Sequence, residues 1–162
     1  MAQSKTSKKT ASPQTVIKFK DETKVHPALS TYFGYCLFKA SARLRQIMDQ
    51  ALMPMKLQTH HVGILKVLEI SGPMSQIELG DALGFDKASM VKMIDHLEKN
   101  KYVVRKTEVS DRRVKIIQVT AKGVSVTRIC HQLKDKVEKE FFKNIQPSEM
   151  QQLKKLVPRL LT

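Results

Sequence analysis

The chain has 162 residues, 41% of them hydrophobic, which is enough for one domain with its own core, with or without a tail. Its formal charge of +14, from 29 Lys and Arg against 15 Asp and Glu, favours a polyanionic partner, although a solvated basic surface is also compatible with it. No uncharged run approaches the ~18 residues of a membrane span, and residues 1–20 contain no signal-peptide core. With two cysteines and no disulfide framework, the sequence predicts a reduced, cytoplasmic protein.

Residues 1–26 are rich in Lys, Ser and Thr and hold six basic and two acidic residues, so we expect a basic flexible arm. This arm is as compatible with DNA phosphates as with solvent. Pro27 suits the first position of a helix, and apolar residues at three- and four-residue steps predict one long helix that ends before Pro54. A second helix is predicted from about Thr59 to Ile70.

Two short helices with a tight turn between them are predicted next. Ser75 and Glu78 form a capping-box pattern, and this helix ends at Leu83-Gly84. Asp86 caps the following helix, whose inward side is Met90 or Val91, Ile94 and Leu97, and whose outward residues include His96. Such a pair is typical of a helix-turn-helix, whose second helix enters the major groove. The expected DNA contacts are Gln76, Lys87, Ala88, Ser89 and Lys92.

A β-hairpin is predicted from the runs Tyr102–Arg105 and Val114–Val119. Its loop carries Asp111-Arg112-Arg113 and is followed by Lys115, and a thin ribbon with Arg at its tip suits a narrow minor groove. Ten basic and five acidic residues lie between Gly84 and Lys122, which supports a DNA-facing surface. Thr120 caps a long amphipathic helix that reaches Phe141, and Ser148 with Gln151 opens a last helix.

Several of these segments resemble the core of the MarR (multiple antibiotic resistance regulator) family in order and spacing. They are Ser75-Gln76-Ile77-Glu78-Leu79, Leu97-Glu98, Val103-Val104-Arg105, Asp111-Arg112-Arg113 and Val119-Thr120-Ala121-Lys122-Gly123. The resemblance covers roughly residues 28–161. It implies a mainly α fold with a small β-hairpin wing, in which a winged helix-turn-helix of about residues 58–120 joins a helical dimerisation layer of residues 27–53 and 121–161.

The resemblance also implies a mechanism. A homodimer would bind a pseudo-palindromic double-stranded operator, with Arg113 in the minor groove and Asp111 orienting the wing arginines. Such regulators usually repress transcription and release DNA when a small molecule or an oxidant reaches the region between the two layers. One residue departs from the family pattern: Lys101 stands where Gly usually closes the recognition helix. We expect the left-handed cap to shift to Asn100, which tolerates that conformation better.

Other kinds of site have less support. Cys36 is a candidate oxidant sensor on the first helix, although a buried packing role suits its apolar stripe better. The His and Cys residues lack metal-ligand spacing, and catalytic motifs are absent, so we expect no metal, no cofactor and no enzyme activity. A winged helix used for protein–protein contact or dimerisation, without operator binding, is the alternative function. No ligand-binding residues are predicted.

Overall fold

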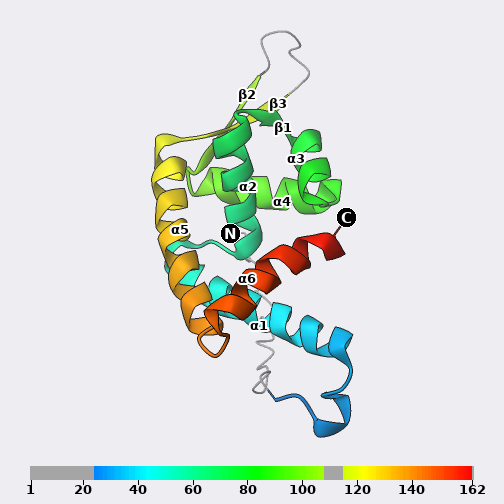
Figure 1. The fold of residues 1–162 in the computed structure, drawn as a ribbon. Coiled ribbons are helices and arrows are strands. Elements are labelled where there is room, and N and C mark those ends of the chain that lie inside the picture. Colours follow the sequence, from blue (N-terminus) through cyan, green and yellow to red (C-terminus); the bar gives the residue numbers. More distant parts are fainter. Residues whose placement is uncertain (1–23, 108–114, 162) are drawn as a thin grey trace, which may run out of the picture.

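The computed structural model describes residues 24–107 and 115–161. Most of them are helical, and a small antiparallel sheet projects from the helices (Figure 1). The elements in chain order are the 3₁₀ helix η1 (Pro27–Leu29), α1 (Phe33–Leu52), the 3₁₀ helix η2 (Met53–Met55), α2 (Thr59–Ser71), β1 (Met74–Ser75), α3 (Gln76–Leu83), α4 (Lys87–Lys99), β2 (Val103–Thr107), β3 (Lys115–Val119), α5 (Ala121–Phe141), α6 (Pro147–Leu156) and the 3₁₀ helix η3 (Val157–Leu160).

The first helix differs from its prediction. Pro27 does begin a helix, but this is the single turn η1, and the chain leaves helical geometry before α1 starts at Phe33. Tyr32 precedes α1 with ψ 89°, outside the helical region, so the predicted single helix is wrong in this segment. The spacing of apolar residues shows which residues would share a helix face. Here the apolar spacing continues from η1 into α1, because both elements carry apolar side chains, and it therefore does not reveal the break between them.

The N-cap of the last helix also lies two residues earlier than its predicted cap. Gln146, rather than Ser148, is the N-cap residue of α6, with Pro147 at the first helical position. The backbone N–H of Gln146 donates to Glu149 Oε2 at 2.8 Å, which closes a capping box. Proline is favoured at this position because its missing N–H would have no partner inside the helix.

The sheet has the strand order β1-β3-β2 and is antiparallel throughout. The hairpin register pairs Val103 with Val119 and Thr107 with Lys115, which confirms the predicted wing. β1 pairs Met74 with Ile117. β1 is not predictable from the sequence, because two residues are too few to show an alternating pattern.

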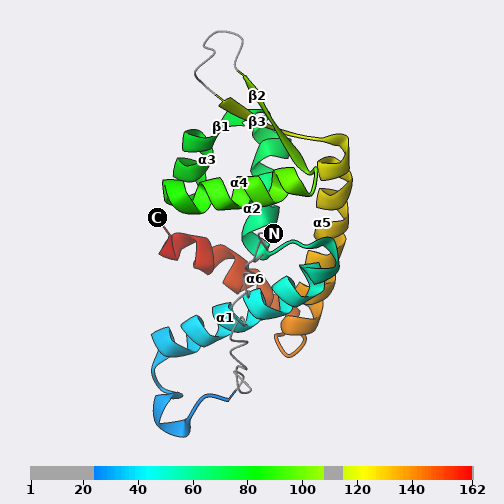
Figure 2. The same cartoon turned by 180° about the vertical axis from the view of Figure 1, so that it is seen from behind.

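The core lies where the winged helix-turn-helix meets α5 and the end of α1. Helix α2 runs through the middle of this arrangement, with α5 on one side and α3 and α4 on the other (Figures 1 and 2). Fully buried side chains come from every one of these parts: Leu52, Leu57, Ile64, Leu65, Leu68, Leu79, Met90, Ile94, Leu97, Ile117 and Cys130. This shared core makes α3, α4 and the long helices one packed unit.

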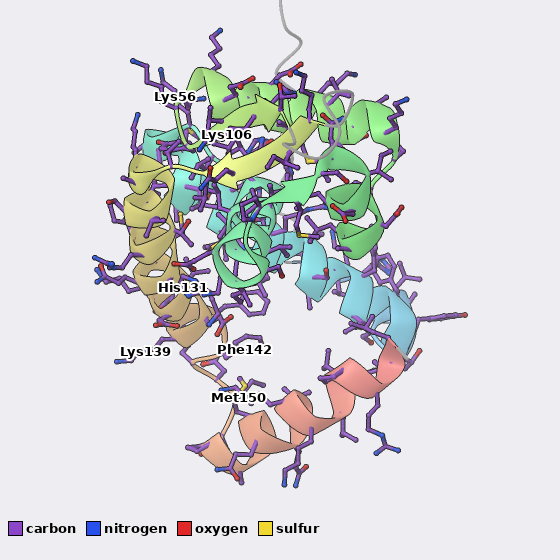
Figure 3. The ribbon with its side chains drawn as sticks, turned by 90° about the horizontal axis from the view of Figure 1, so that it is seen from above. Lys56, Lys106, His131, Lys139, Phe142 and Met150 are labelled. Atoms are coloured by element: carbon purple, nitrogen blue, oxygen red, sulfur yellow. The ribbon has the colours of Figure 1, made fainter. Side chains whose placement is uncertain are left out.

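Apolar side chains at the two ends of the described chain are far more exposed than those of the core. Phe33 and Phe38 of α1 are 75% and 67% exposed, and the apolar side chains of α6 and η3 are exposed as well. Figure 3 shows α6 standing apart from the helices of the core. None of the helices in the described ranges is long and apolar enough to cross a bilayer.

Candidate nucleic-acid interface

The helix-turn-helix is held by caps at each of its corners. Ser75 Oγ accepts the N–H of Glu78 at 3.2 Å, and Glu78 Oε2 accepts the N–H of Ser75 at 2.7 Å, which is the predicted capping box. These bonds to Ser75 lower the pKa of the Glu78 carboxyl. Gly84 ends α3 with φ 69°, a left-handed conformation that glycine adopts without a steric penalty. The turn therefore follows directly from its sequence.

Helix α4 turns its basic side away from the core. Met90, Met93, Ile94 and Leu97 are buried, whereas Val91 is partly exposed, so the inward position left open by the sequence belongs to Met90. The predicted contact residues Lys87, Ala88 and Lys92 are all exposed, and Gln76 at the start of α3 is half-buried. The predicted contact residues of the helix-turn-helix therefore lie at the start of α3 and in the first two turns of α4.

Ser89, a predicted DNA contact, is hydrogen-bonded within its own helix cap. Its N–H donates to Asp86 Oδ1 at 2.9 Å, and its hydroxyl donates to Asp86 Oδ2 at 2.6 Å. These two bonds lower the pKa of the Asp86 carboxyl and cap α4. Because its one hydroxyl hydrogen is engaged, Ser89 is left with acceptor capacity, which matches an amino group on a base edge and not a phosphate.

The wing begins on the paired strands β2 and β3. Lys115 of β3 donates from Nζ to Thr107 Oγ1 on β2 at 2.6 Å, across the last pair of the register. The predicted tip residues Asp111, Arg112 and Arg113 lie outside the described residues. Their roles in the minor groove therefore stay predictions.

Arg105 of β2 binds the recognition helix instead of facing a partner. Its guanidinium forms ion pairs with Asp95, at 2.5 Å, and with Glu98, and its backbone N–H donates to Glu98 Oε1 at 3.1 Å. Burial alone would lower the pKa of the guanidinium, but the two carboxylates raise it. The basic balance counted from the sequence thus includes a cation that is used to join α4 to the wing.

Helix α4, the predicted recognition helix, ends on a left-handed lysine. Lys101 has φ 62° and donates its N–H to the carbonyl oxygen of Glu98 at 2.8 Å, whereas Asn100 keeps φ −86°. The predicted shift of the cap to Asn100 is therefore wrong. Asn100 is held back because its side chain donates to the carbonyl oxygen of His96 at 2.8 Å, and the Lys101 carbonyl accepts the Thr120 hydroxyl at 2.8 Å. These hydrogen bonds of neighbouring residues keep the left-handed cap at Lys101, although asparagine tolerates the conformation better than lysine does.

The Val119–Gly123 segment ties α5 to the wing. Thr120 Oγ1 accepts the N–H of Gly123 at 3.0 Å and lies 3.2 Å from the carbonyl oxygen of Tyr102. At Gly123 a β carbon would collide with that same Tyr102 oxygen. The motif therefore combines a helix cap with a position where only glycine fits.

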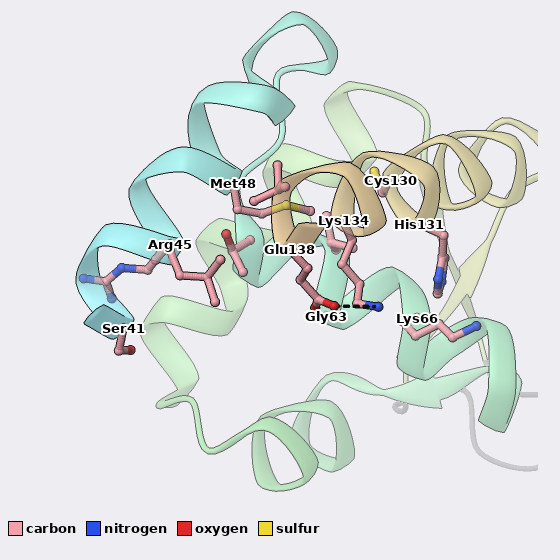
Figure 4. Close-up of a pocket in the computed structure, with 13 residues that line it drawn as sticks. Ser41, Arg45, Met48, Gly63, Lys66, Cys130, His131, Lys134 and Glu138 are labelled. Carbon is pink, nitrogen blue, oxygen red and sulfur yellow. Dashed lines mark ion pairs between the residues drawn. The ribbon is translucent and has the colours of Figure 1, made fainter. Parts of the chain in front are cut away.

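A cavity of about 520 Å³ lies between α1, α2 and α5 (Figure 4). The Lys134 amino group lies 3.5 Å from Glu138 within its lining, and the buried His131 Nε2 has no hydrogen-bond partner among the described residues. Leu44, Met48, Val62 and Val137 supply apolar wall. An apolar cavity with a few converging polar groups is the usual form of a small-molecule site. The sequence offered no local signal for it, since its walls come from three separate helices.

The two cysteines differ in their burial. Cys36 is half-buried, with its sulfur 3.5 Å from the carbonyl oxygen of Ser30, and Cys130 is fully buried beside the cavity. Burial raises the pKa of the Cys130 thiol, which disfavours the reactive thiolate. Among the described residues, no three His, Cys, Asp or Glu side chains are grouped so that they would hold a metal ion.

The comparison with known proteins agrees with this arrangement. Residues 59–115, from the start of α2 to the start of β3, match the sequence model described as the MarR family. The wild-type MarR of E. coli without ligand is 21% identical, with a TM-score of 0.70 over 86% of this chain and 99% of that chain. A MarR mutant from E. coli complexed with operator DNA is 21% identical, with a TM-score of 0.73 over 82% of this chain and 95% of that one.

A third similar structure is BpsR of Bordetella bronchiseptica, described by the regulation of its DNA binding by 6-hydroxynicotinic acid. It is 20% identical, with a TM-score of 0.71 over 85% of this chain and 96% of that one. The long helices are included in these matches as well as the winged unit. The chain thus has the fold of the MarR regulators, and its residues 59–115 are similar to the MarR family in sequence.

Proposed function

We propose that the chain is a sequence-specific, double-stranded DNA-binding transcriptional regulator without enzyme activity, working in the cytoplasm. The observation that carries this proposal is the orientation of α4: its apolar side is buried, and Lys87, Ala88 and Lys92 face outward from its first two turns. A helix held in this way offers short and basic side chains to the edges of bases in a major groove. A protein of the same fold bound to operator DNA supports this use of the fold.

The active species in this proposal is a homodimer. Leu156, Leu160 and Leu161 are 50%, 64% and 86% exposed at the C-terminal end, and the aromatic side chains at the start of α1 are similarly open. Burial of these two surfaces against a second copy would remove a large apolar area from water. A two-fold dimer would place two α4 helices in successive major grooves of a pseudo-palindromic site, about 34–36 Å apart.

The cavity between α1, α2 and α5 is the proposed effector site. Its lining is mainly apolar and includes the ion-paired amino groups of Lys66 and Lys134, and the regulation of BpsR by 6-hydroxynicotinic acid supports a small organic acid as the class of ligand. A ligand that binds better to one spacing of the two α4 helices would shift the dimer toward that spacing. Weaker operator binding would then relieve repression.

Selection of bound sequences from a random duplex pool tests the function directly. A two-fold symmetric consensus, bound by a dimer, is the expected result. The selected duplex would then be titrated with small aromatic and aliphatic acids to look for release. Enrichment of no sequence, together with binding of a protein through the same α4 surface, would favour the interaction module instead.

A further inference from the structure

The turn between α1 and α2 is bonded to the recognition helix. Lys56 in this turn has φ 55°, a left-handed conformation rare for lysine, and its N–H donates to the carbonyl oxygen of Met53 at 2.9 Å. Two consecutive carbonyl groups of the turn then accept bonds from the far side of the winged unit. The Tyr102 hydroxyl donates to the Met55 oxygen at 3.0 Å, and His96 Nε2 donates to the Lys56 oxygen at 2.5 Å.

His96 is itself held in place by a second histidine. Its ring stacks on the ring of His61, with centroids 4.5 Å apart and planes 13° from parallel. His61 cannot turn freely because its Nδ1 accepts the N–H of Gln58 at 3.0 Å, as part of the capping box of α2. Although the sequence analysis placed His96 among the outward residues, the structure leaves it half-buried and bonded.

The same turn is bonded to the long helix on its other side. Asp49 of α1 accepts both the N–H and the hydroxyl of Thr59, at 2.6 and 2.7 Å. Residues 55–61 are therefore fixed to α1 through Asp49 and to α4 through His96. A shift of α1 relative to the winged unit has a direct hydrogen-bonded route to the last turn of the recognition helix.

We propose that His96 is a positioning residue, which sets the tilt of α4 by holding its last turn to the Lys56 carbonyl. This inference rests on the proposed function. Lys87 lies nine residues before His96, about 14 Å along the helix at 1.5 Å per residue. A tilt of 10° about the His96 end would move the first turn by about 2 Å, which is more than a base-specific hydrogen bond tolerates. Phosphate contacts, which are less directional, would suffer less.

Replacement of the donor and of the ring separately tests this role. His96→Gln places an amide donor near the position of Nε2, whereas His96→Phe keeps a ring on His61 without the donor. We expect His96→Phe to weaken binding to the selected operator about three- to tenfold, which corresponds to the loss of one hydrogen bond. Its binding to nonspecific duplex should be unchanged. His96→Gln should restore operator binding to within about twofold of the wild type. Tyr102→Phe, which removes only the second anchor's hydroxyl, should act in the same direction as His96→Phe.

A distance measurement without DNA separates positioning from a general loss of stability. A nitroxide label on Lys87→Cys, in a Cys36→Ser background, reports the spacing of the two α4 starts across the dimer by pulsed electron resonance. His96→Phe should broaden this distance distribution, and His96→Gln should keep it narrow. If His96→Phe leaves the distribution and the operator affinity unchanged, or lowers operator and nonspecific affinity equally, the role is overturned. If the wild type selects no operator, the proposed function fails, and the distance distributions still decide the role of His96.

Discussion

Gly123, in the first turn of α5, faces the backbone carbonyl of Tyr102 so closely that a β carbon at position 123 would strike that oxygen. The clash is with backbone, which cannot rotate away as a side chain can. Tyr102 in turn is fixed, because its N–H donates to the Leu97 oxygen and its hydroxyl to Met55. The beginning of α5, the end of α4 and the turn after α1 therefore meet at one residue.

Gly123→Ala is expected to destabilise the protein by about 1–3 kcal/mol, because the overpacked site must move the strand or the helix. Urea unfolding followed by circular dichroism measures the change. Gly34→Ala in α1 is the matched control, since no atom of the described part of the chain lies within 4 Å of a β carbon there. Alanine has the higher helix propensity, so the control should gain up to about 1 kcal/mol. Equal behaviour of the two variants would contradict the close packing at Gly123.

Lys101→Gly should stabilise the protein by about 1 kcal/mol, because glycine adopts the left-handed conformation at φ 62° without a steric penalty. Lys101→Ala removes the same charge but keeps the β carbon, so it should show none of this gain. Thermal unfolding of both variants side by side separates the backbone effect from the charge effect. A gain shared by both substitutions would point to charge repulsion as its source.

The stability of the fold should fall as the pH is lowered from 7 to 5. Burial, and then the nearby His60 and His96, lower the pKa of His61 to about 3. In the unfolded chain His61 takes up a proton near pH 6.5, whereas in the folded chain it does so only near pH 3. The contribution of His61 to the free energy of unfolding is therefore fully present above pH 6.5 and is lost as the pH falls from 6.5 to 3. The slope approaches about 1.4 kcal/mol per pH unit for one proton.

The histidine variant decides where this pH dependence arises. His61→Gln should flatten the dependence of urea midpoints between pH 7 and 5, above the range in which most carboxyl groups titrate. His60, whose pKa is also lowered, mainly by burial, contributes in the same direction and would leave a smaller residual slope. A wild-type stability that does not change over this range would show that His61 accepts its proton in the folded state.

Lys92→Ala should weaken operator binding by about 1–3 kcal/mol and relax preference at one or two central positions, if its amino group reads a base. If Lys92 contacts only phosphate, binding to all sequences should weaken alike, and the slope of log K against log salt should become less steep by about one for each subunit. Lys139→Ala is the control, since Lys139 is exposed on α5 near the end far from α4. Equal losses from both variants would leave only general basicity.

A different effect is expected for Arg113, at the predicted tip of the wing. Arg113→Ala should weaken operators with A·T-rich flanks most, because a narrow minor groove attracts a guanidinium group more strongly. Competition binding with operators that differ only in their flanks measures this. Uniform loss across the flanks would remove Arg113 from the minor groove and leave it a phosphate contact.

Most of the winged unit was predictable because its signals are local. The cap at Ser75, the glycine at position 84 and the cap at Asp86 each act within four residues, and each lies where the sequence analysis placed it. His96 was misjudged because its partner, the Lys56 carbonyl, is 40 residues away. Helical spacing places a side chain on a face, but it carries no information about a distant turn that comes to cover that face.

The ion pairs of Arg105 mean that affinity and selectivity would change in opposite directions if its partners were lost. Asp95→Asn would leave the Arg105 guanidinium paired with Glu98 alone and add net positive charge, which strengthens attraction to any polyanion. The same change would loosen α4 from the wing strand and blur the recognition of one sequence over another. The dissociation constant for the operator alone would combine these two opposing effects and change little. The same variant would bind nonspecific DNA more tightly than the wild type.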